Sequence, residues 1–268
     1  MESDGSSPST ATNRDPDAQA SRATEERGTV PHAAPYPATR YSALDALGSD
    51  DPEVRARSLE VLATAYWRPV YAHVRLKWRR GPEDAEDLTQ EFFARAFAKR
   101  VFDAYDPDKG RFRTFLRTCL DRFVANEAKA RRRLKRGGGV ITVRFDFHAA
   151  ESELSAGSAE HASDVEAAFD REWVAALFRV GVERLRTECE AKRKQVHFRL
   201  FETLVLADEG DKRSYAALAE EFGISVYDVT NYLAYARREF RRHVLEQLRA
   251  ITATEEEFKD EVRAVLGA

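Results

Sequence analysis

The sequence predicts an all-α protein with two helical domains joined by a flexible linker. Apolar residues recur three or four positions apart in 54–123 and again in 169–240, which is the period of an amphipathic helix. Between these segments the period lapses, and 137–165 is rich in glycine, serine and alanine, as interdomain linkers are. The short run 141–147 has no obvious partner strand, so we expect an extended segment there.

The 268-residue chain is long enough for two small domains with tails. Its first forty residues hold five of the nine prolines and lack Leu, Ile, Phe and Trp, so they cannot bury enough apolar surface to offset the entropy of ordering. The predicted segments are a disordered tail at 1–40, a helical domain at 41–136, the linker at 137–165, a second helical domain at 166–250 and a C-terminal helical extension at 251–268.

Charge is strongly segregated along the chain, although the net charge is only −3. Acidic residues gather in the tails and at 83–91, whereas Arg and Lys gather at 111–136, 192–199 and 237–242. The two kinds of segment therefore predict partners of opposite sign.

Several classes of protein find little support. Cys119 and Cys189 are the only cysteines and lie in no metal-ligand pattern, so we expect neither a disulfide framework nor a zinc site. No run of about 18 apolar residues and no signal-peptide segment occurs, which predicts a soluble, cytoplasmic protein without a membrane partner. The histidines are scattered, and the glycines at 137–139 lack the Lys-Ser/Thr of a phosphate loop. We expect no enzyme, no metal and no cofactor.

The first domain is predicted to be a bundle of four helices. One should begin at Asp51-Pro52, where an Asp cap precedes proline, and the chain should restart a second helix at Tyr66-Trp67-Arg68-Pro69 that stops at Gly81. The patterns at 83–100 and 111–134 predict the other two helices.

The helix predicted at 83–100 carries an acidic side and an apolar side. Leu88, Phe92 and Ala96 are four residues apart and share one side, and acidic residues line another. A basic, aromatic helix follows from residue 111, and it leads into 129–136, where six of eight residues are basic. Taken alone, the acidic side and the basic run could each be a solvated face, and Phe112, Phe115 and Phe123 are more typical of a core than of base stacking.

A helix-turn-helix motif is predicted at 215–242. Small Ala219 allows two helices to approach, and Gly223 permits a turn with positive φ. Ser225, with Asp228 three residues later, is a capping box for the second helix. Thr254 begins the last short helix in the same way.

At these residues the chain resembles bacterial RNA polymerase sigma factors. Asp84-Ala-Glu-Asp-Leu-Thr-Gln-Glu-Phe-Phe is similar to the helix of sigma region 2 that docks on the β′ clamp of core RNA polymerase. The segment 112–133 resembles the helix that opens the promoter and reads its minus-ten element, and 215–242 resembles the helix-turn-helix of region 4, which reads the minus-thirty-five element and binds the β flap. The compact extracytoplasmic-function group, in its long-linker subset, is the closest match.

The resemblance implies the partners and the site residues. It implies that polymerase is bound by Asp84, Asp87, Leu88, Gln90, Glu91 and Phe92. It implies that promoter DNA is bound by Arg111, Arg113, Arg117, Arg122, Asn126, Lys129, Arg132, Arg133, Ser225, Tyr227, Asp228, Thr230, Asn231, Arg237, Arg238 and Arg241. On the outer face of the second helix of the motif, the early residues and Tyr235 can reach outward. The early residues would meet base edges while Arg237, Arg238, Arg241 and Arg242 hold phosphates.

The chain also departs from this group. Phe115 stands where many members have Trp, and Leu120-Asp121-Arg122 stands where many have Ala-Arg-Asn, so the promoter preference is open. The head, the long linker and the C-terminal helix are additions that suggest regulation within the chain. A separate anti-sigma factor is an alternative regulatory partner.

The predicted function is that of a sigma factor which binds core polymerase and directs promoter recognition, melting and initiation. A different reading is a helix-turn-helix regulator that acts without polymerase. A third is an adaptor whose basic helices bind other acidic partners.

Overall fold

The structure, a computed structural model, describes residues 42–130, 145–156, 165–207 and 213–267. Every regular element in these ranges is helical, so the predicted all-α class is confirmed. The described residues belong to one compact unit that runs from Arg40 to Ala268. The predicted disordered tail lies outside them. Within the described ranges, no helix combines the length and apolar character needed to cross a bilayer.

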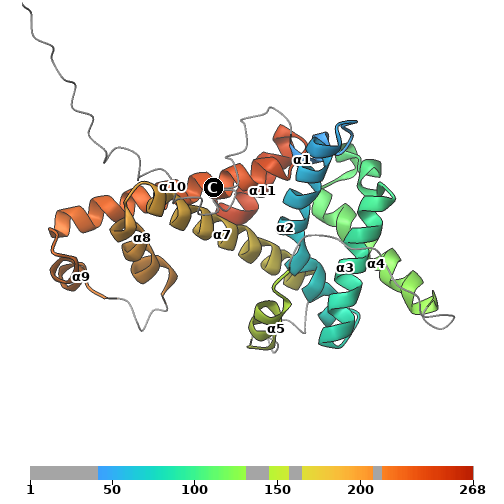
Figure 1. Ribbon diagram of the computed structural model, residues 1–268, viewed down its shortest axis with the longest axis horizontal. Coiled ribbons are helices and arrows are strands. Elements are labelled where there is room, and N and C mark those ends of the chain that lie inside the picture. The colour runs from blue at the N-terminus through green and yellow to red at the C-terminus, as the bar shows by residue number, and fades with distance from the viewer. Residues whose placement is uncertain (1–41, 131–144, 157–164, 208–212, 268) are drawn as a thin grey trace, which may run out of the picture. The chain divides into compact units, whose positions relative to one another are not determined.

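The first helices are α1 (Ala43–Ala46) and the long α2 (Pro52–Leu76) (Figure 1). The predicted start of α2 is confirmed, because the Asp51 carboxylate accepts the Glu53 N–H at 2.9 Å and Pro52 occupies the first position.

The predicted break at Tyr66–Pro69 is wrong. Pro69 lies inside α2, which continues without interruption to Leu76 rather than to Gly81. A proline within a helix costs about 3 kcal/mol, because it removes one backbone hydrogen bond and crowds the preceding turn. Tyr66 and Val70 on either side are buried in the core, so packing outweighs this local cost.

The bundle is completed by α3 (Pro82–Ala98), two 3₁₀ turns, η2 (Val101–Ala104) and η3 (Pro107–Lys109), and α4 (Phe112–Ala130). Both α3 and α4 pack against α2. Phe112 lies at the centre of this core, where its ring contacts Tyr66 and Phe102 edge-on at centroid distances of 5.4 and 5.5 Å. These contacts fix the position at which α4 begins.

Part of the predicted linker is a helix, α5 (Phe147–Ala156). The prediction of an extended segment as far as Phe147 is therefore wrong at its end, while 141–144 lie outside the described residues. Phe145 stacks on Trp67 of α2 with 5.1 Å between ring centroids, and the Glu151 carboxylate accepts from the Arg75 guanidinium. Aromatic packing and ion pairing thus hold α5 on α2.

The long helix α7 (Val165–Ala191) contacts both α2 and the second half of the chain. Phe169, Trp173 and Leu177 are buried in the same core as Tyr66. Farther along, Gly181 faces α10 (Val226–Ala250) so closely that an added Cβ would lie 2.9 Å from Val244 Cγ2. The division into two separate domains stays a prediction.

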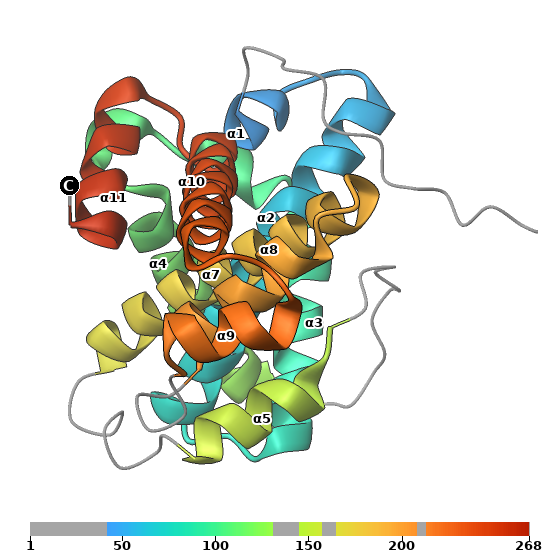
Figure 2. The ribbon, with the colours of Figure 1, turned by 90° about the vertical axis from the view of Figure 1, so that its left-hand side faces the viewer.

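The remaining elements are α8 (Gln195–Phe201), a π-helical turn η4 (Glu202–Leu206), α9 (Tyr215–Phe222) and α11 (Glu255–Leu266). Gly223 ends α9 with φ +63°, in the left-handed region that favours glycine, so the predicted turn is confirmed. Figure 2 shows α11 beside α10 and α4, and ion pairs described below join α11 to α4.

Candidate functional site

The acidic side of α3 is built at the helix N-terminus. Pro82 occupies the first turn together with Glu83 and Asp84, whose charges oppose the positive end of the helix dipole. Asp87 and Gln90 are exposed one turn later. These side chains leave a polar, negatively charged face available to a partner.

Two of the predicted polymerase-binding residues lie in the core instead. Leu88 and Phe92 are almost completely buried, and the Phe92 ring contacts Phe123 of α4 at a centroid distance of 5.7 Å. Glu91 is half-buried and pairs with Arg95, which also pairs with Glu127 of α4. In this conformation these residues position α3, and its exposed face consists of the more N-terminal acids and Gln90.

The basic residues at the beginning of α4 are occupied by carboxylates. Arg113 Nη1 lies 2.9 Å from Asp170 of α7, and its Nε lies 3.1 Å from Glu261 of α11. Arg111 lies 3.7 Å from Glu261, and Arg117 lies 3.4 Å from Glu166.

Aromatic rings of α7 cover two of these arginines, Arg113 and Arg117. The Arg113 guanidinium lies 4.8 Å from the Trp173 ring centroid, and that of Arg117 lies 5.9 Å from Phe169. Their side chains are only 11% and 17% exposed. Arg113 and Arg117 therefore do not present their charge to solvent.

The other residues of this segment that were predicted to bind DNA fall into two groups. Arg122 and Asn126 are exposed and lie on the open side of the helix. The side chain of Lys129, and Arg132 and Arg133 entirely, lie outside the described residues. An outward basic surface on α4 thus begins at Arg122.

Asp121, one of the departures from the sigma pattern, joins α4 to α2. Its carboxylate accepts from Lys77 Nζ at 2.7 Å and from Trp78 Nε1 at 3.0 Å, and it contacts His73 Nε2 at 2.9 Å. Burial raises the pKa of this carboxyl, but the hydrogen bonds from Lys77, His73 and Trp78 outweigh it and the net direction is downward. Asp121 therefore has a structural role that the sequence did not indicate.

The helix-turn-helix is confirmed in its local geometry. Ser225 Oγ accepts the Asp228 N–H at 3.1 Å, and the Asp228 carboxylate accepts the Ser225 N–H at 3.1 Å, which is the predicted capping box. Hydrogen bonds from Ser225 lower the pKa of Asp228. Both side chains cap α10 here, and their contact with DNA stays a prediction.

The outer face of α10 is open at the positions predicted to read bases. Tyr227 is 74% exposed, and Thr230 and Asn231 are exposed near it. Arg237, Arg238 and Arg241 are exposed farther along the helix, although Arg238 contacts Glu239 at 3.1 Å. This order gives a polar, aromatic end followed by a basic end.

Two residues that the sequence placed on this outer face are engaged within the protein. Arg242 bonds Glu239 at 2.8 Å and Glu246 at 2.7 Å, and it pairs with Glu188 of α7, so its predicted role as a phosphate contact is not supported by its position. Tyr235 is half-buried beneath Lys194, whose Nζ lies 3.6 Å from the ring centroid.

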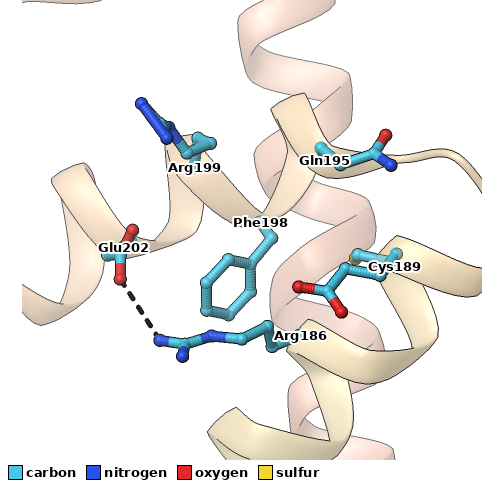
Figure 3. Close-up of a pocket in the computed structure, with 7 residues that line it drawn as sticks. Arg186, Cys189, Gln195, Phe198, Arg199 and Glu202 are labelled. Carbon is cyan, nitrogen blue, oxygen red and sulfur yellow. Dashed lines mark ion pairs between the residues drawn. The ribbon is translucent and has the colours of Figure 1, made fainter.

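A small open pocket lies between α7 and α8 (Figure 3). Its volume is about 300 Å³, and an ion pair of 3.5 Å between Arg186 and Glu202 crosses it. Burial, followed by the charge of Glu188, raises the pKa of the lining Cys189, which disfavours the reactive thiolate. The pocket offers no activated nucleophile at this cysteine.

The acids that cover α4 were missed from the sequence. For the acids of α11 the only signal was the acidic composition of the predicted last helix, and for those of α7 there was none, since the partners are far apart along the chain. The residues concerned are Glu166, Asp170, Glu257, Asp260 and Glu261.

Comparison with known protein families matches part of the chain. Residues 62–134 match the family model described as Sigma-70 region 2, a span that begins within α2 and contains all of α3 and α4. The comparisons with curated proteins and with solved structures each gave no match. The matched span contains both the acidic face of α3 and the basic α4, and it supports a sigma factor role in polymerase binding and promoter melting.

Proposed function

We propose that this chain is a sigma factor of the extracytoplasmic-function type, with a long linker, that directs core RNA polymerase to promoters. The observation that carries the proposal is the Sigma-70 region 2 match over 62–134, because it falls on the helices that the sequence singled out. The role is binding and positioning, not catalysis, and it places the protein in the cytoplasm with polymerase.

The polymerase contact is assigned to the exposed face of α3, with Asp84, Asp87 and Gln90 meeting the β′ clamp. Asp84 lies in the first turn of α3, where the helix dipole favours carboxylates, and Asp87 and Gln90 are exposed one turn later. Leu88 and Phe92 support it from the core. A basic surface on the clamp would complement it.

Promoter contacts are assigned to two surfaces. Arg122 and Asn126 on the outer side of α4 continue toward the basic run 129–136 and would meet the melted minus-ten strand, where basic and aromatic groups bind bases and phosphates. Tyr227, Thr230 and Asn231 would enter the major groove at the minus-thirty-five element, with the exposed arginines of α10 on phosphates.

Joining both surfaces in one chain makes the second contact intramolecular. The covalent connection raises the effective concentration of the second surface at its site, so weak individual contacts suffice. In the transcribing complex the helix-turn-helix would also lie on the β flap, and an anti-sigma factor that covered either surface would keep the chain from polymerase.

One observation favours a second candidate, a helix-turn-helix regulator that acts without polymerase. The outer face of α10 is accessible in this conformation, whereas Arg113 and Arg117 of α4 are covered. DNA binding through α10 alone would need no rearrangement.

Size-exclusion chromatography of the purified chain with core RNA polymerase separates the two functions. The sigma factor proposal predicts co-elution that Asp87→Arg abolishes, because the substitution places a positive charge within the docking face. Glu60→Arg is the matched control, since Glu60 is an exposed acid on α2 outside the matched span. Failure of the wild-type chain to co-elute, or equal effects of both substitutions, would contradict the proposal.

A further inference from the structure

Helix α11 occupies the N-terminal end of α4 with two carboxylates. Glu257 Oε1 accepts the Phe112 N–H at 2.9 Å and the Tyr105 hydroxyl at 3.2 Å. Its other oxygen accepts the Ala253 N–H at 2.8 Å, so Glu257 does not close a capping box with Thr254. The first amides of a helix lack partners within the helix and attract anions, so Glu257 sits where a phosphate would be bound.

The second carboxylate, Glu261, depends on the arginines of α4. Its side chain is only 2% exposed, and its Oε1 lies 3.1 Å from Arg113 Nε. Its Oε2 has no hydrogen-bond partner within the described residues and lies 3.7 Å from Arg111 Nη1. An acid buried in this way is held mainly by the charge of the guanidinium groups beside it.

The cover extends from α11 onto α7. Asp170 and Glu166 pair with Arg113 and Arg117, while Asp260 lies 3.9 Å from Arg111. All three arginines at the beginning of α4 therefore have carboxylate partners supplied by other helices. Arg122, farther along the same helix, is exposed.

We propose that α11 is an internal competitor for nucleic acid, which occupies the phosphate-binding end of α4 until it is displaced. This inference rests on the proposed function, because it concerns the promoter-melting helix of that proposal. In the described conformation a single strand can reach the outer surface of α4 at Arg122, whereas binding at the N-terminal end of α4 requires α11 to leave.

The physical reason is that the first amide of α4 already donates to Glu257, and Arg113 and Arg111 already face the Glu261 carboxylate, so a phosphate can bind there only by displacing these acids. A purely structural contact would be served as well by apolar residues, since burying ion pairs often gives no net stability. Docking of α11 on α4 and binding of DNA to α4 then oppose each other, and the coupling is reciprocal. A partner that captures α11 raises the affinity of α4 for the strand by the same factor by which the bound strand weakens the docking of α11.

The test compares two double variants of the full chain. Glu257→Gln with Glu261→Gln removes the two carboxylates that occupy α4. Glu255→Gln with Glu256→Gln removes the same charge from the same helix at exposed positions. Fluorescence anisotropy with a labelled single-stranded DNA oligonucleotide should show about tenfold tighter binding for the first variant, within the usual range for coupled sites, and little change for the second.

Equal effects of the two variants would overturn the proposal, because net charge alone would then explain them. So would unchanged affinity of the first variant, or a lack of binding by every version. Hydrogen exchange of the wild-type chain tests it without a substitution: α11 amides should exchange faster when the oligonucleotide is added, and unchanged exchange contradicts it.

The co-elution experiment with core polymerase tests the sigma factor proposal, and its outcome is independent of this binding test. A chain that co-elutes, but whose first variant binds no tighter, loses this inference alone. A chain that fails to co-elute, but whose first variant binds tighter, loses the sigma factor proposal while the competition remains.

Discussion

Arg113 of α4 and Glu261 of α11 are in direct contact, with 3.1 Å between Nε and Oε1, and both side chains are nearly inaccessible to solvent. Asp170 of α7 lies on the other side of the guanidinium group. One arginine therefore connects the promoter-melting helix of the proposed function with two helices from the C-terminal part of the chain. Several measurable properties follow from this arrangement and from its neighbours.

The first prediction concerns pH. Burial raises the pKa of Glu261, Arg113 and Arg111 oppose the shift, Glu257 and Asp170 add to it, and the net direction is upward. As pH rises above the ordinary value of 4.5, the unfolded chain loses this proton before the folded chain does, so the free energy of unfolding falls. Urea unfolding over a pH series should show this fall in the wild type relative to Glu261→Gln. Parallel stability curves would contradict it.

Adjacent arginines on α10 should behave differently toward DNA. Arg241 is exposed and has no ion-pair partner among the described residues, so Arg241→Ala should reduce the salt slope of duplex binding by about 0.9. Arg242→Ala should leave the slope unchanged and lower the free energy of unfolding by about 1 kcal/mol, because that side chain is partly exposed and pairs internally. Anisotropy titrations at several salt concentrations distinguish them, and equal slope changes would refute the assignment.

The cap of α10 should contribute to stability. Ser225→Ala removes the hydroxyl that accepts the Asp228 N–H and should lower the free energy of unfolding by about 1 kcal/mol. Thr187→Ala is the control, because the Thr187 hydroxyl bonds a carbonyl within α7 and satisfies no end group. Urea denaturation of both variants checks this, and a smaller loss for Ser225→Ala than for the control would count against the capping role.

Close approach of α7 and α10 at Gly181 gives the last stability prediction. Gly181→Leu should destabilise the protein by about 1–3 kcal/mol, because even a Cβ there would lie 2.9 Å from Val244 and 3.0 Å from Phe240. Gly48→Leu, at an exposed position whose nearest atom is 3.8 Å away, should have little effect. Thermal unfolding compares them, and similar melting temperatures for the two variants would show that the helices can separate at this point.

The sequence predicted those features that depend on neighbouring residues. Asp51 with Pro52, Gly223, and Ser225 with Asp228 each act within four positions of one another, and the structure has the expected caps and turn there. The resemblance to sigma region 2 likewise rested on a continuous segment, and the family match falls on it.

Features that depend on distant residues were not predictable in this way. Pro69 is a local helix breaker, but burial of Tyr66 and Val70 keeps α2 continuous. Helix α5 lies in a stretch whose composition is that of a linker. What holds it in place is a long-range contact, that of Phe145 with Trp67, which the local sequence does not show. Long-range pairing also explains why Arg111, Arg113 and Arg117, which were predicted to face DNA, pair instead with acids that are distant along the chain.

Run-off transcription with purified core RNA polymerase tests the sigma factor assignment most directly. Core polymerase with the full chain should produce discrete transcripts from particular fragments of the genome that encodes it, core polymerase alone should not, and Asp87→Arg should remove those transcripts. Identical products with and without the chain would contradict the account.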